Sequence, residues 1–120
     1  MVLVPVNNPQ SVRLLSVNEM PLPENEKLRQ AAEATGFLMT GTIGLTLRYG
    51  IYLISDYRQD RRLIVHELAH VAQYERYGGI MEFLQQYLYE CITIGHPEAP
   101  MEQEAISTAD RILSQNHPGS

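Results

Sequence analysis

The sequence predicts a single α+β domain over residues 1–120, and three observations support this. First, 120 residues of which 44% are hydrophobic are enough for one small core. Second, residues 42–55 are rich in β-branched and aromatic residues and interrupted by a turn, as in a β-hairpin. Third, three later segments carry helical periodicity or helix-ending signals.

The N-terminal third is predicted to be an extended arm followed by a helix. The arm covers residues 1–20, and apolar residues between positions 12 and 17 favour a short strand within it. Residues 24–34 place acids in the first turn and strong helix formers after it, and Gly36 follows closely. This pattern predicts the first helix.

A β-hairpin is predicted from residues 42–47 and 51–55, with a turn that contains Gly50. In the first strand the apolar residues occupy alternate positions, whereas Gly44 and its flanking threonines share the opposite face. We expect this second face to be available for a functional role.

Three further helices are predicted over residues 61–77, 80–92 and 101–113. Asp60 is a suitable N-cap for the first of them, and Gly78 ends it. The second has apolar residues at every third or fourth position, which predicts a buried face that includes Cys91. Pro100 precedes the last helix, and residues 115–120 are expected to fray.

Composition excludes several classes of partner. The chain has 9 basic and 14 acidic side chains, whereas binding to nucleic acid requires a clustered basic surface. Cys91 is the only cysteine, which favours a reducing compartment, and we expect a cytoplasmic protein. Prolines interrupt the first residues, which argues against a signal peptide, and the longest apolar stretch is shorter than the roughly 20 residues of a membrane helix. We therefore expect neither a nucleic-acid nor a membrane partner.

The strongest chemical signal is the sequence His66-Glu-Leu-Ala-His70, an H-E-x-x-H motif on a predicted helix. Histidines four residues apart on a helix project to one point, as the ligands of a tetrahedral zinc ion must. Glu67 lies beside that point, where it would act as general base on a zinc-activated water. The chain's four histidines and 11 glutamates predict roughly 0.01 chance occurrences of the motif.

The third zinc ligand is sought among the carboxylates and histidines downstream. On the last predicted helix Glu102 lies in the middle of the apolar face, and a buried carboxylate needs a partner or a metal. Glu102 is therefore the preferred ligand, with Glu104 and His96 as alternatives. Glu104, on the polar face, is otherwise expected to be solvated or to support a ligand. His96 is otherwise a loop residue or a donor to an oxyanion.

Two other side chains lie near the motif. Gln73 and Tyr77 share the histidine face, where they could line the far end of the site, although packing against the following helix is the favoured expectation. His117 is expected to have no role, and no tyrosine is singled out as a stabiliser of transition-state charge.

The motifs resemble those of the zincin metallopeptidases, in particular a short bacterial group. The shared pieces are a hairpin over residues 42–55, the run H-E-L-A-H-V-A-Q from His66, and the run P-M-E-Q-E-A from Pro100. In glutamate-liganded zincins a glutamate on a following helix is the third ligand, and the resemblance assigns this role to Glu102. It also implies an edge strand that pairs with an extended peptide.

These observations together predict a zinc-dependent metallopeptidase. His66, His70 and Glu102 are the expected zinc ligands, Glu67 is the expected general base, and a peptide or protein is the expected substrate. Two alternatives remain open. One is a zinc-binding protein-interaction module with weak or no activity, and the other is a metal-dependent hydrolase of a non-peptide amide or ester.

Overall fold

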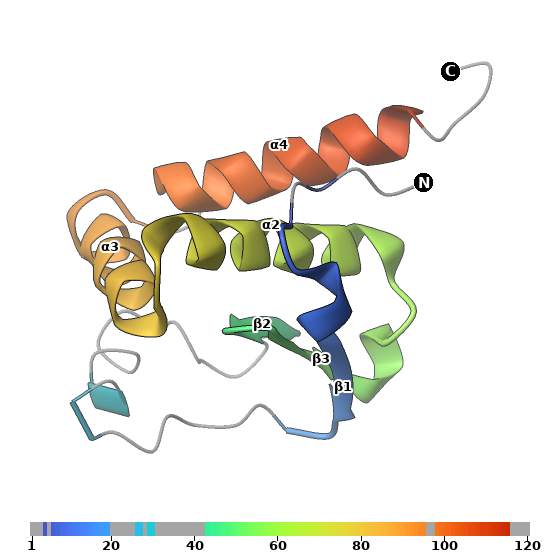
Figure 1. Ribbon diagram of the computed structural model, residues 1–120, viewed down its shortest axis with the longest axis horizontal. Helices are drawn as coiled ribbons and strands as arrows, with labels where there is room; N and C mark the ends of the chain where they lie inside the picture. The colour runs from blue at the N-terminus through green and yellow to red at the C-terminus, as the bar shows by residue number, and fades with distance from the viewer. Residues whose placement is uncertain are drawn as a thin grey trace.

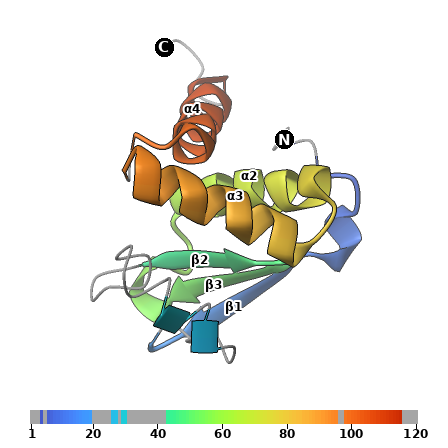
Figure 2. The ribbon, with the colours of Figure 1, turned by 90° about the vertical axis from the view of Figure 1, so that its left-hand side faces the viewer.

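The computed structural model has the predicted α+β architecture. It describes residue 4 and residues 6–19, 26–27, 29–30, 43–95 and 98–115. Within these residues, the helices α2 (Arg61–Tyr77), α3 (Ile80–Thr93) and α4 (Pro100–Gln115) accompany a sheet of three strands. Helix α2 lies between the sheet and α4, as Figure 1 shows. Figure 2 shows α3 crossing α2 at a steep angle, above the sheet.

The sheet has the strand order β1-β3-β2. Strands β2 (Gly44–Leu47) and β3 (Gly50–Ile54) form the predicted antiparallel hairpin. Strand β1 (Arg13–Val17) confirms the strand predicted in the N-terminal arm, and it pairs with β3 in parallel. Within the described ranges β2 is therefore an edge strand, with β3 on one side only.

The hairpin turn differs from the prediction that its glycine makes the turn. Arg48 takes the left-handed conformation, with φ of 56°, and Gly50 is already the first residue of β3. A Cβ atom on Gly50 would lie 3.3 Å from the carbonyl oxygen of Leu47. Gly50 thus allows the two strands to approach each other closely. The left-handed conformation of Arg48 costs a non-glycine residue about 1 kcal/mol.

The helix ends agree with the predicted signals. The side chain of Asp60 accepts a hydrogen bond from Leu63 N at the start of α2, and Gly78 ends the helix with φ of 83°. Helices α3 and α4 run one or two residues beyond their predicted ends. Of the helix predicted over residues 24–34, the four described residues are helical and the rest lies outside the described residues, as do positions 116–120 of the predicted tail.

Helix α2 is packed on both sides because it forms the middle layer. Val71 packs against Ile51 and Leu53 of the sheet, whereas Val65 packs against Ala109 and Ile112 of α4. A third cluster joins α3 to the start of α4, and it consists of Phe83, Leu84, Tyr87 and Met101, with Cys91 packed against it as predicted. No helix in the described ranges has the length and apolar character needed to cross a bilayer.

The N-terminal segment is tied to α2 by Glu75. The carboxylate accepts hydrogen bonds from Asn7 N at 2.7 Å, from Asn8 N at 3.0 Å and from the Tyr49 hydroxyl at 2.8 Å. Burial raises the pKa of Glu75, but these hydrogen bonds outweigh it and hold the pKa below its ordinary value of 4.5. Because the folded pKa is the lower one, this stabilisation is complete above pH 4.5 and is lost as the pH falls through the folded pKa.

We expect Glu75→Gln to lower the free energy of unfolding by about 1 kcal/mol at pH 7, since the hydrogen bonds would lose their ionised acceptor at a partly exposed position. The difference from the wild type should shrink as the pH falls, because acid also neutralises Glu75. Urea unfolding of both proteins in steps from pH 7 downward measures this. A difference that stays constant with pH would contradict an ionic role.

Candidate metal centre

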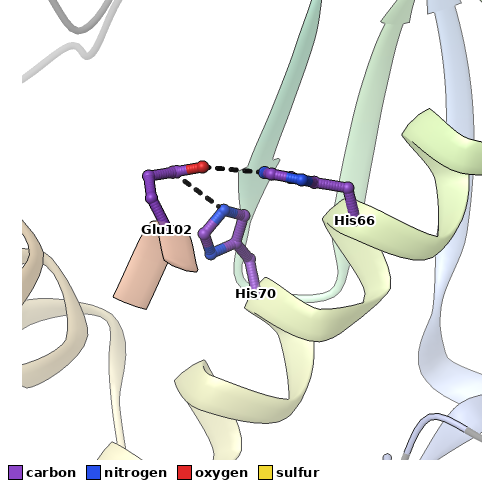
Figure 3. Close-up of side chains that lie close together, drawn as sticks. All are labelled: His66, His70 and Glu102. Atoms are coloured by element: carbon purple, nitrogen blue, oxygen red, sulfur yellow. Dashed lines mark hydrogen bonds and ion pairs between the residues drawn. The ribbon is translucent and has the colours of Figure 1, made fainter. Parts of the chain in front are cut away.

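Two histidines of α2 and one glutamate of α4 meet at a single point. His66 and His70 lie one helical turn apart, with ring centroids 5.1 Å from each other. The Glu102 carboxylate lies 2.8 Å from His66 Nε2 through Oε1 and 3.1 Å from His70 Nε2 through Oε2. Figure 3 shows both rings turned toward the carboxylate. The ligand atoms offered by the three residues all lie within 4.8 Å of one another.

Two of the three residues of the cluster are buried and His66 is half-buried, so the charges of the cluster are only weakly screened by water. The side chains of His70 and Glu102 are only 6% and 5% exposed. Burial raises the pKa of Glu102, but hydrogen bonds from the two histidines and from Tyr87 outweigh it, so this pKa lies far below its ordinary value. Burial lowers the pKa of His70, yet the hydrogen bond to Glu102 and the charges of Glu67 and Glu102 raise it to about 9. An ionised carboxylate therefore faces two histidine rings, and the His70 ring favours its protonated form.

Tyr87 of α3 fixes the Glu102 carboxylate from the other side. Its hydroxyl donates a hydrogen bond of 2.6 Å to Oε2. Burial raises the pKa of Tyr87, and the charge of Glu102 raises it further, so the phenol remains a donor. The Tyr87 ring also makes an edge contact with the His70 ring, with centroids 5.7 Å apart. One α3 side chain thus contacts residues of both α2 and α4.

The start of α4, which carries Glu102, is held by α3. The helix follows Ala99, which offers no side-chain cap, and Glu90 of α3 supplies one instead. Its Oε1 accepts a hydrogen bond of 2.8 Å from Met101 N, while Oε2 accepts one of 2.9 Å from Gln86. An acceptor at a helix N-terminus satisfies an otherwise unpaired backbone N–H. Glu90 thereby helps to fix the position of the first turn of α4, which carries Glu102.

Glu67 points toward the edge strand. The Thr46 hydroxyl lies 2.7 Å from Glu67 Oε1 and donates to this carboxylate, and it also lies 3.0 Å from the Glu67 carbonyl oxygen. A Cβ atom on Gly44 would lie 3.1 Å from Glu67 Oε2 and 2.8 Å from Leu63 Cδ1, so a residue with a side chain there would push strand and helix apart. The face of β2 that was expected to be available for function therefore contacts the predicted general base.

The structure brings Glu102, the preferred candidate for the third ligand, beside both histidines. Glu104 does not reach them, and its carboxylate instead accepts hydrogen bonds from Gln73 and Arg76, both at 2.7 Å. This agrees with a supporting role for Glu104. His96 and His117 lie outside the described residues.

Of the two interpretations of Gln73, packing against α3 was favoured, but the structure supports the other one, a position beside the site. Gln73 is fully buried, and its amide contacts His70 of its own helix and two residues of α4. Tyr77, considered with it, is 38% exposed. Helical arithmetic placed Gln73 on the histidine face, but only the position of α4 shows what its amide contacts.

Sequence reasoning also gave no role to Tyr87, Thr46 or Glu90. A weak signal existed for two of them. Tyr87 falls on the predicted buried face of α3, and a buried tyrosine hydroxyl usually has a hydrogen-bond partner. Thr46 falls on the polar face of its strand. Nothing in the sequence indicated that Glu90 would cap a helix that begins ten residues later.

The donor set fits a divalent metal. Two imidazole nitrogens and one carboxylate oxygen are typical ligands of zinc in sites that keep a position for water or substrate. The described residues supply these atoms at one buried point, where a cation would take the place of the two Nε2 protons.

Comparisons with protein families, with curated proteins and with solved structures find no match for this chain. The resemblance to zincins therefore depends on the motif residues themselves.

Proposed function

We propose that this chain is a zinc-dependent metallopeptidase, with His66, His70 and Glu102 as metal ligands and Glu67 as general base. The observation that carries the proposal is the convergence of the three ligand atoms within 4.8 Å, although Glu102 lies more than 30 residues beyond the motif. Part of the proposal is a reducing, cytoplasmic location, which the single cysteine favours.

The metal and Glu67 would have separate roles in the reaction. When bound, zinc is a Lewis acid that lowers the pKa of water to about 7 and polarises a carbonyl. Glu67 would accept the proton of the attacking water and return it to the leaving amine. The hydrogen bond from Thr46 occupies Glu67 Oε1 and leaves Oε2 for this proton transfer.

The edge strand β2 is the proposed binding surface for the substrate backbone. An extended peptide added to a sheet edge forms main-chain hydrogen bonds without regard to side chains. In the described ranges β2 is paired with β3 alone, and its Thr46 contacts Glu67. A peptide paired with β2 would therefore pass close to the general base. This arrangement favours a peptide over a small amide or ester.

Metal analysis tests the centre directly. We expect about one zinc ion per chain in protein purified without a chelator or a His tag, and none after His66→Ala. Circular dichroism of both proteins checks that the variant is folded. Absence of zinc from the wild type, even after zinc is offered in solution, would contradict the proposed centre.

A further inference from the structure

Gln73 occupies a position between the two helices that form the centre. It lies three residues after His70 on α2, and none of its surface is exposed. Its Oε1 lies 2.8 Å from His70 Nδ1, and its Nε2 lies 2.9 Å from the Met101 carbonyl oxygen and 2.7 Å from Glu104 Oε1. Every polar atom of this side chain is therefore used.

The partners of Gln73 fix which way its amide points. The Met101 carbonyl and the Glu104 carboxylate are acceptors, so the two hydrogens of Gln73 Nε2 must point to them. Glu104 is held in place by Arg76, whose guanidinium donates to the same Oε1 at 2.7 Å. The remaining amide atom, Oε1, can only accept, and it faces His70 Nδ1. The Nδ1 atom of His70 must therefore carry a proton and donate it.

This assignment decides which nitrogen of His70 is the ligand. A neutral imidazole with a proton on Nδ1 has its lone pair on Nε2, and Nε2 is the atom that faces Glu102. Outer hydrogen bonds of this kind fix the tautomer and the ring orientation of metal-bound histidines. The same amide holds α4, because Met101 and Glu104 flank Glu102 in the chain.

We propose that Gln73 is the positioning residue of the metal centre, which presents His70 Nε2 to the metal and ties His70 to the turn of α4 that carries Glu102. The inference rests on the proposed metal centre and extends it to this chain's own second layer of contacts. A residue that only filled space would need the volume of Gln73 but not its donor and acceptor pattern.

Zinc affinity of two variants separates these possibilities. Gln73→Leu keeps the approximate volume and removes every hydrogen bond, and we expect about 10- to 100-fold weaker zinc binding. Gln73→Met, which has nearly the length of glutamine, is a second variant that removes the same hydrogen bonds, and we expect a loss of the same size. Gln85→Leu, at an exposed position of α3, is the matched control and should bind like the wild type.

The readouts are zinc affinity by competition with a chelator and long-range proton–nitrogen NMR spectra of the zinc-loaded proteins. The spectra should show a proton on His70 Nδ1 in the wild type, with Nε2 as the zinc ligand. Wild-type affinity in a folded Gln73→Leu or Gln73→Met variant would overturn the proposal. Should both variants fail to fold, the spectrum of the zinc-loaded wild type decides, and zinc bound to His70 Nδ1 would be the contrary result.

The outcome also separates this inference from the proposed function. If the wild type binds zinc and Gln73→Leu weakens binding, but no peptide is cleaved, Gln73 retains its role and the peptidase proposal fails. If zinc binds equally well to both proteins, the role of Gln73 fails and the centre stands. If the wild type binds no zinc, both fail.

Discussion

Glu67→Gln is expected to reduce peptide hydrolysis by about 10²- to 10⁴-fold, the usual contribution of a general base, while the zinc content stays at the wild-type level. Glutamine has nearly the same shape as glutamate, and its Oε1 still accepts the hydrogen bond from Thr46. The variant therefore removes the proton acceptor without removing the contact between β2 and α2.

A mixed peptide library, with new termini counted by mass spectrometry, measures the activity and requires no choice of a single substrate. Glu98→Gln makes the same chemical change at an exposed position before α4 and serves as the control. Both variants should contain as much zinc as the wild type. Equal cleavage by the wild type and by Glu67→Gln would remove Glu67 from the mechanism.

Glu102→Ala is expected to abolish the stabilisation that zinc gives to the fold. A ligand present at 100 times its Kd stabilises the native state by about 2.7 kcal/mol, which corresponds to a rise in Tm of about 10 °C for a domain of this size. The wild type should show this rise with zinc. The variant should show none, because one of the three ligand atoms is missing.

The same replacement also disturbs the metal-free protein, since His66, His70 and Tyr87 lose their common acceptor. The comparison is therefore made within each protein, with and without zinc, by thermal unfolding. Glu98→Ala is the matched control and should keep the full zinc-dependent rise. A zinc-dependent rise in Glu102→Ala equal to that of the wild type would show that the third ligand is another residue.

These two experiments also distinguish the alternative functions. Zinc-dependent stabilisation without cleavage of any peptide would favour a zinc-binding interaction module. Cleavage of small amides or esters, but not of peptides, with the same dependence on Glu67 would favour a non-peptide hydrolase, because the chemistry of the motif is shared. Loss of activity in both Glu67→Gln and Glu102→Ala, with zinc lost only from the second, is the pattern expected of the peptidase.

Local sequence signals were sufficient to predict the elements around the candidate site and the residues that form it. Helix α2 begins and ends at residues with strong local signals, Asp60 and Gly78, and the position of one residue on a helix fixes the direction of the next. This regularity was enough to place His66 and His70 together. It was also enough to place Glu102 on the buried face of α4, because a regular pattern of apolar residues identifies that face.

The contacts between elements that are distant in the chain could not be predicted and are known only from the fold. The parallel pairing of β1 with β3, the cap that Glu90 provides for α4, and the contacts of Thr46 and Gln73 all join separate elements. Such contacts depend on how helices and strands are oriented to each other, and hydrophobic periodicity carries no information on that orientation. Gln73 shows the same limit: its face on α2 was predictable, whereas the helix that its amide contacts across from that face was not.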